Sequence, residues 1–134
     1  MSAETVRRGY ECLNEGDLDG ALALWDPDVV CVLPEGGINT GRIEGRDKVR
    51  GFLSHYLDTF DSFRMHPERF VEAEGGRVVA FVEMTGAGKG SGLEFKTRQA
   101  HVCTVGDEGL VTRIEVFTEG GKGALESVGL SSDD

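Results

Sequence analysis

The sequence predicts an α+β fold, with most helices in the first half of the chain and most strands in the second. Up to residue 60, apolar residues mainly repeat every three to four positions, the period of an amphipathic helix. Beyond residue 60 the repeat shortens to two, the period of a half-buried strand. Most of the 20 glycines lie between predicted strands, where tight turns need them. We therefore expect one domain over residues 1–130 and a frayed tail over 131–134.

Three helices are expected in the first half of the chain. The segments 4–14 and 18–25 each carry apolar residues at helical spacing. Asp17 is placed to cap the second of these helices, and Pro27 to stop it, because proline has no backbone N–H to donate. The clearest helix follows at 47–60. Its apolar stripe consists of Val49, Phe52, Leu53, Tyr56, Leu57 and Phe60.

The strands are predicted from apolar runs and from the turn residues between them. Residues 29–33 form a short apolar run that ends at Pro34, and the polar stretch 38–45 is a loop or a short strand. Four longer segments alternate apolar and polar residues and are separated by glycine-rich turns. They are 63–73, 77–85, 93–105 and 110–118, and a short last helix is expected within 120–130.

The charge of the chain limits its partners. Acidic residues number 24 and basic residues 14, so the net charge is −10, which disfavours nucleic acid and anionic lipid as partners. No apolar run approaches the roughly 20 residues of a membrane span. The N-terminal residues enter a helical pattern directly, without the features of a signal peptide. We therefore expect a soluble cytoplasmic protein that binds neither nucleic acid nor membranes.

Cysteine and histidine spacing gives no sign of a metal or a cofactor. Cys12, Cys31 and Cys103 form no CxxC pair, and the three histidines show no ligand spacing. We expect free thiols, no metal and no cofactor.

Three segments carry a resemblance to a known family. They are Leu13-Asn14-Glu15-Gly16-Asp17-Leu18-Asp19-Gly20-Ala21-Leu22-Ala23-Leu24-Trp25, Gly45-Arg46-Asp47-Lys48-Val49-Arg50-Gly51-Phe52 and Gly109-Leu110-Val111-Thr112-Arg113-Ile114-Glu115. With the order of elements, they resemble the SnoaL-like and ketosteroid-isomerase-like proteins of the nuclear-transport-factor-2-like superfamily. The resemblance implies a cone-shaped α+β barrel, in which a strongly curved, mainly antiparallel sheet wraps around the long helix and encloses a ligand pocket. It also implies a homodimer through the outer face of the sheet.

The function that the resemblance implies is small-molecule binding, and two interpretations stay open. One is a cofactor-independent isomerase, cyclase or lyase that uses acid–base chemistry on a small polar-apolar substrate. The other is a non-catalytic ligand-binding or dimerisation module. Ketosteroid isomerase activity is not implied, because Gly9, Leu33 and Ala100 fall where that enzyme has its tyrosine, its base and its acidic donor. Tyr10 is one residue away, about 100° around the helix.

Candidate site residues follow from strand alternation combined with the register of the resemblance. If Ala100 faces the pocket, Glu83, Arg98, Arg113 and Glu115 face it too. Glu83 and Glu115 are then the catalytic candidates, and Arg98 and Arg113 would hold an anionic substrate group. The alternative is a salt-bridged network that faces solvent. Further expected substrate-binding residues are Tyr10, Leu33, Tyr56, Phe81 and Phe117.

The same alternation assigns other residues to the outer face of the sheet. They are His101, Cys103, Thr112, Ile114 and Val116. Because this set is largely apolar, we expect it to form the interface of the homodimer.

Overall fold

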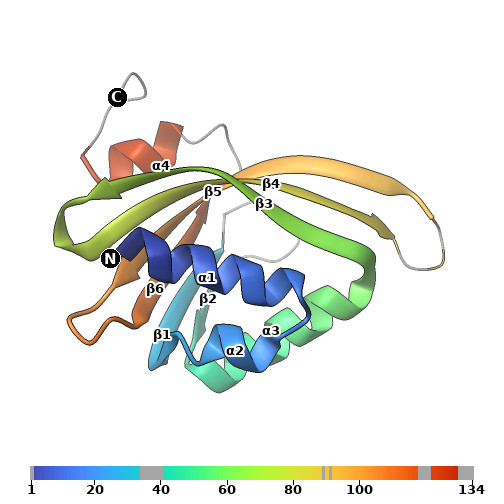
Figure 1. The fold of residues 1–134 in the computed structure, drawn as a ribbon, viewed down its shortest axis with the longest axis horizontal. Helices are drawn as coiled ribbons and strands as arrows, with labels where there is room; N and C mark the ends of the chain where they lie inside the picture. The colour runs from blue at the N-terminus through green and yellow to red at the C-terminus, as the bar shows by residue number, and fades with distance from the viewer. Residues whose placement is uncertain (1, 34–40, 89, 91, 118–121, 130–134) are drawn as a thin grey trace.

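The computed structural model describes residues 2–33, 41–88, 90, 92–117 and 122–129 (Figure 1). Its helices are α1 (Ser2–Asn14), α2 (Leu18–Leu22), α3 (Arg46–Thr59) and α4 (Lys122–Ser127), with a short 3-10 turn, η1 (Glu74–Gly76). Its strands are β1 (Trp25–Leu33), β2 (Gly41–Glu44), β3 (Phe60–Ala73), β4 (Arg77–Gly88), β5 (Glu94–Val105) and β6 (Val111–Phe117). None of the helices in this described part has the length and apolar character needed to cross a membrane.

The strands form one curved sheet in the order β2-β1-β6-β5-β4-β3. Neighbouring strands are antiparallel except for β1 and β6, which run parallel. Helix α1 lies against one face of the sheet and α4 against the other, and the long β4–β5 hairpin reaches past the end of α1 (Figure 1). The predicted α+β class, with a curved and mainly antiparallel sheet around helices, is confirmed.

The two faces of the sheet have separate apolar layers. We call the face that packs against α1 and α3 the inner face, and the face under α4 the outer face. The inner layer of α1 and β4 consists of Val6, Tyr10, Leu13, Val78, Ala80, Val82 and Met84. A second inner cluster, around α3 and β1, includes Trp25, Val29, Cys31, Val49 and Val111. The outer cluster consists of Val79, Ala100 and Val102 under Ala124, Leu125 and Val128 of α4.

The second helix is shorter than the sequence predicts. Helix α2 begins after its Asp17 cap, whose carboxylate accepts a hydrogen bond from the Gly20 N–H at 2.9 Å, but it ends at Leu22. Trp25 belongs to β1, because the pairing of β1 with β6 extends back to it. Pro27 therefore lies within a strand rather than ending a helix. It is tolerated there because the β1–β6 register is interrupted between Trp25 and Val30, so its missing N–H removes no regular ladder bond.

The bounds of β2 and β3 also differ from the predicted segments. The stretch 38–45, predicted as a loop or a short strand, contains the strand β2, which pairs with the end of β1. Its residues 38–40 lie outside the described part of the structure. Strand β3 begins at Phe60, directly after α3 and three residues earlier than predicted. The expected tail over 131–134 lies outside the described residues.

The Asn14 side chain joins the end of α1 to β3. Its amide donates to the Met65 carbonyl and accepts from the Met65 N–H, both at 2.7 Å. The side chain thus pairs with a strand backbone as a neighbouring strand would, which fixes the end of α1 against the sheet.

Candidate functional site

A tyrosine and a histidine meet inside the inner layer. The Tyr10 hydroxyl lies 2.7 Å from Nδ1 of His101, and each residue is only 7% exposed. Their rings are stacked with centroids 5.8 Å apart. On the other side of the imidazole, Nε2 lies 2.9 Å from Oε1 of Gln99. The three side chains form a hydrogen-bonded chain that begins on α1 and ends on β5.

Burial determines the protonation states of Tyr10 and His101 in this hydrogen-bonded chain. It lowers the pKa of His101 from 6.5 to about 4, so the imidazole is neutral near pH 7 and carries one N–H. Because Nδ1 is the one acceptor for the buried Tyr10 hydroxyl among the described residues, Nδ1 accepts from that hydroxyl. The ring N–H is therefore on Nε2, and Oε1 of Gln99 accepts it. Burial also raises the pKa of Tyr10, which keeps the phenol protonated and able to donate.

Burial on the inner face of β5 changes at Gln99. His101 and Cys103 are buried, Gln99 is half-buried, and Thr97, two residues further along, is exposed. Gln99 therefore lies at the boundary between the buried part of the inner face of β5 and the part whose side chains are half-buried or exposed.

Three phenylalanines gather beyond that boundary. The ring of Phe95 lies 5.0 Å from that of Phe60 and 6.3 Å from that of Phe63, measured between centroids. All three are half-buried. Gly86 makes room for the group, because a Cβ at that position would lie 2.8 Å from the Phe95 ring. The result is an apolar surface on the same face of β5 as Gln99, four residues further along the strand.

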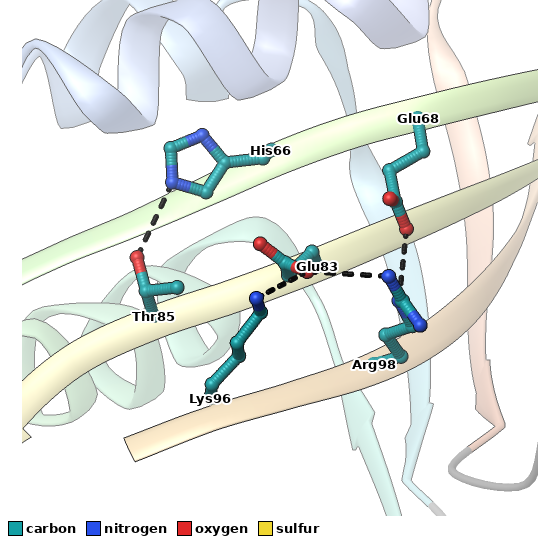
Figure 2. A network of polar contacts seen from close by, with 6 residues as sticks. All are labelled: His66, Glu68, Glu83, Thr85, Lys96 and Arg98. Carbon is teal, nitrogen blue, oxygen red and sulfur yellow. Dashed lines mark hydrogen bonds and ion pairs between the residues drawn. The ribbon is translucent and has the colours of Figure 1, made fainter. Parts of the chain in front are cut away.

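Two of the charged residues expected inside the cone are placed elsewhere by the structure. Glu83 and Arg98 do meet, at 3.4 Å, but on the outer face, where Arg98 also contacts Glu68 at 3.1 Å and Lys96 contacts Glu83 at 3.5 Å (Figure 2). The Arg98 side chain is 68% exposed and that of Glu83 is 18% exposed. The prediction that they face the interior is wrong, and the solvent-facing salt-bridge network describes them.

The other predicted pair is also on the outer face. Arg113 donates to Glu115 at 2.9 Å on β6, whose Ile114 faces inward. Phe81 and Phe117, expected to bind substrate, pack against the outer cluster under α4. No contact among the described residues joins the Arg113 pair to the Glu83 network.

The remaining predicted binding residues are divided. Tyr10 belongs to the inner layer. Leu33 also lies inside, packed against the cluster around α3 and β1. Tyr56 lies in α3, and its side chain is outside what the structure describes.

The residues assigned to a dimer interface are on the inner face. His101 contacts Tyr10 of α1, and Cys103 and Ile114 pack in the α1 cluster. Thr112 and Val116 share that face with Ile114 by alternation. This prediction of the interface is therefore wrong.

A single error of one residue explains why all of these side chains lie on the opposite face from the predicted one. The strands β4, β5 and β6 pair in direct register, with Glu83 opposite Arg98 and Val102 opposite Glu115. The prediction placed Ala100 on the pocket side, whereas it lies under α4. Because side chains alternate with a period of two, an error of one residue in that anchor turns every assignment on the three strands to the wrong face.

Sequence reasoning missed His101 and Gln99 as members of the site. A signal was present, since Tyr10 shares its helical stripe with Val6 and Leu13, and that stripe predicts burial. A buried tyrosine needs a hydrogen-bond partner for its hydroxyl, and an inward His101 provides one.

A hollow of about 310 Å³ lies elsewhere, between α2 and the start of α3. It is lined by Asp19, Leu22, Ala23, Arg46, Asp47 and Arg50, of which Asp19 and Arg50 form an ion pair. Four of these six residues are charged, so the hollow is poorly suited to an apolar ligand.

Comparison with known proteins agrees with the fold. Residues 6–114 match the family described as SnoaL-like domain. The solved structure of TerC, co-crystallised with polyporic acid, is 27% identical, with a TM-score of 0.77 over 95% of this chain and 96% of that one. An NTF2-like protein of unknown function from Burkholderia pseudomallei is 25% identical, with a TM-score of 0.77 over 96% of this chain and 97% of that one.

A more distant structure is similar in fold alone. Δ5-3-ketosteroid isomerase from Mycobacterium sp. is 19% identical, with a TM-score of 0.73 over 86% of this chain and 90% of that one. A search among curated proteins finds no match.

Proposed function

We propose that this chain, which belongs to the SnoaL-like family, binds a small and largely apolar molecule between α3 and the inner face of the sheet. The observation that carries the proposal is the half-buried phenylalanine group, Phe60, Phe63 and Phe95, on the same face of the sheet as the Tyr10–His101–Gln99 chain. Apolar walls with a few polar groups at one point are typical of small-molecule sites.

Two further observations support this location. Leu53 of α3 packs against both inner clusters and is itself half-buried, so α3 forms an apolar wall opposite the sheet. The TerC structure, at 27% identity over nearly the whole chain, was obtained with a small organic molecule, polyporic acid. A ligand of that kind is therefore a reasonable probe for this chain.

Acid–base catalysis on such a ligand is the second candidate, and the buried Tyr10–His101 pair favours it. Tyr10 and Nδ1 of His101 satisfy each other in this structure, so catalysis requires the Tyr10 hydroxyl to turn from Nδ1 to the ligand. The phenol then supplies a proton donor and Nδ1 an acceptor, as an isomerase, cyclase or lyase requires. Glu83 and Glu115 do not enter this proposal, because both lie on the outer face.

Binding can be tested with fluorene, an apolar three-ring probe, and with polyporic acid, each titrated into the protein by fluorescence or absorbance. Phe95→Ala should weaken fluorene binding about tenfold, because it removes a large apolar contact. Phe81→Ala is the matched control, since this half-buried phenylalanine lies on the outer face. Saturable binding that Phe95→Ala and Phe81→Ala weaken equally, or no binding at all, would contradict the proposal.

We also propose a homodimer in the cytoplasm. The outer face presents charges of both signs in neighbouring rows, Glu68 and Glu83 beside Lys96 and Arg98, which two copies of the chain can pair across a twofold axis. The free cysteines favour a reducing compartment.

Light scattering tests this assembly. Arg98→Glu should give a monomer, because it makes the acidic side chains repel, whereas Arg7→Glu on α1 should leave a dimer. A wild-type monomer at micromolar concentration would refute the dimer.

A further inference from the structure

We propose that Gln99 orients the ligand, by donating a hydrogen bond from its side-chain amide to a carbonyl or anionic oxygen of the bound molecule. The inference rests on the proposed function, because it takes the ligand to lie on the inner face beside Phe60, Phe63 and Phe95. It specifies the ligand class as an apolar ring system that carries a hydrogen-bond acceptor.

The first support is the way in which Gln99 is held. Its Oε1 lies 2.9 Å from Nε2 of His101, and no other hydrogen bond of this side chain exists in the described part of the structure. The carbonyl end is therefore engaged, and the amide NH₂ retains two donors. The side chain is half-buried, at the point where exposure of the inner face begins, so the NH₂ is accessible to a ligand that lies along this face.

The second support is that the hydrogen-bonded chain fixes which end of Gln99 is free. Among the described residues the Tyr10 hydroxyl has no acceptor other than Nδ1 of His101, so Nδ1 accepts its proton. The single N–H of the neutral ring is then on Nε2, where Oε1 of Gln99 accepts it. If the Gln99 amide were turned over, its NH₂ would face the N–H of Nε2, donor against donor. Tyr10 and His101 are thus positioning residues, and Gln99 presents a donor in a fixed direction.

The third support is the apolar surroundings. Val82 lies opposite Gln99 in the β4–β5 register and is 1% exposed, and the phenylalanine group continues the same face beyond the exposed Thr97. A donor in such a place discriminates between ligands, because a bound ligand without an acceptor covers the N–H and leaves it unpaired.

The test compares two probes with the same ring frame, fluorene and 9-fluorenone, of which only the second has a carbonyl oxygen. We expect the wild-type protein to bind fluorenone about tenfold more tightly than fluorene, the effect of one hydrogen bond in an apolar site. Gln99→Leu should reduce that ratio to about one without weakening fluorene binding. Gln99→Glu should also abolish the preference, because it keeps an acceptor for His101 but loses the donor.

Two more variants separate positioning from a general structural effect. Thr97→Val changes a polar residue two positions away on the same strand face and should leave the ratio unchanged. Tyr10→Phe should lower the ratio only in part, since it removes the donor to Nδ1 but leaves the ring in place.

The possible results are distinguishable. Equal affinity of the wild type for the two probes, or a ratio that survives Gln99→Leu, would overturn the role of Gln99 and leave the proposed binding function standing. If neither probe binds the wild-type protein, the proposed function fails, and the inference about Gln99 fails with it.

Discussion

The hydroxyl of Tyr10 and Nδ1 of His101 lie 2.7 Å apart, although 91 positions separate the two residues in the chain. This contact joins the middle of α1 to the middle of β5 inside an otherwise apolar layer. Each residue satisfies the hydrogen-bonding group that the other buries, so removing either one leaves a buried polar group without its partner.

Tyr10→Phe should destabilise the folded protein by about 1–3 kcal/mol. The substitution keeps the ring but leaves Nδ1 of His101 buried without its donor. Urea unfolding followed by circular dichroism measures the loss. A double-mutant cycle with His101→Leu should then show a coupling energy of about 1 kcal/mol or more. A free energy of unfolding unchanged within about 0.3 kcal/mol would mean that the contact contributes nothing.

Stability should fall as the pH decreases from about 6.5 towards 4. The pKa of His101 is lowered by burial to about 4, so in this range the unfolded chain binds the proton and the folded protein does not. Each pKa unit corresponds to about 1.4 kcal/mol, which predicts a loss of roughly 2–3 kcal/mol by about pH 4.5. Tyr10 and Cys103, which lie beside the ring, keep their protons throughout because burial raises the pKa of both.

The control for this prediction is His101→Gln, which removes the titrating group. The difference between the two unfolding curves isolates His101 from the carboxylates of the chain. Titration of the His101 ring near 6.5 in the folded protein would contradict its buried, neutral state.

Glu83→Gln should have little effect on either stability or ligand binding. The carboxylate pairs with Lys96 and Arg98, whose side chains are mostly exposed, so we expect a loss below about 1 kcal/mol that shrinks in high salt. Fluorene affinity should be unchanged, because Glu83 is on the outer face. A tenfold loss of fluorene affinity would contradict this placement and show that Glu83 contributes to the binding site.

Gly86→Ala should weaken fluorene binding while the protein remains folded. The new methyl group would lie 2.8 Å from the Phe95 ring, so that ring must move from its position beside Phe60 and Phe63. Combining it with Phe95→Leu relieves the contact and should recover the unfolding midpoint but not the affinity. Thermal unfolding and the fluorene titration together check this result. Unchanged affinity in Gly86→Ala would mean that the Phe95 ring is not part of the binding site.

The sequence by itself predicts the elements and their order. The helical stripe of α3, the alternation of the strands and the glycine-rich turns are local properties, and each is found close to its predicted position. The Asp17 cap is also local, because a carboxylate three residues before an N–H can bond it whatever the rest of the chain does. The resemblance carried by residues 13–25, 45–52 and 109–115 then identified the family correctly.

Tertiary structure decided which side of the sheet is the inside. Alternation says that Arg98 and Ala100 share one face and that Gln99 and His101 share the other, but it does not say which face meets the helices. That choice depends on packing, because α1 covers His101 and Cys103 while α4 covers Ala100 and Val102. A period of two has two phases with identical local patterns, and only contacts between distant segments distinguish them.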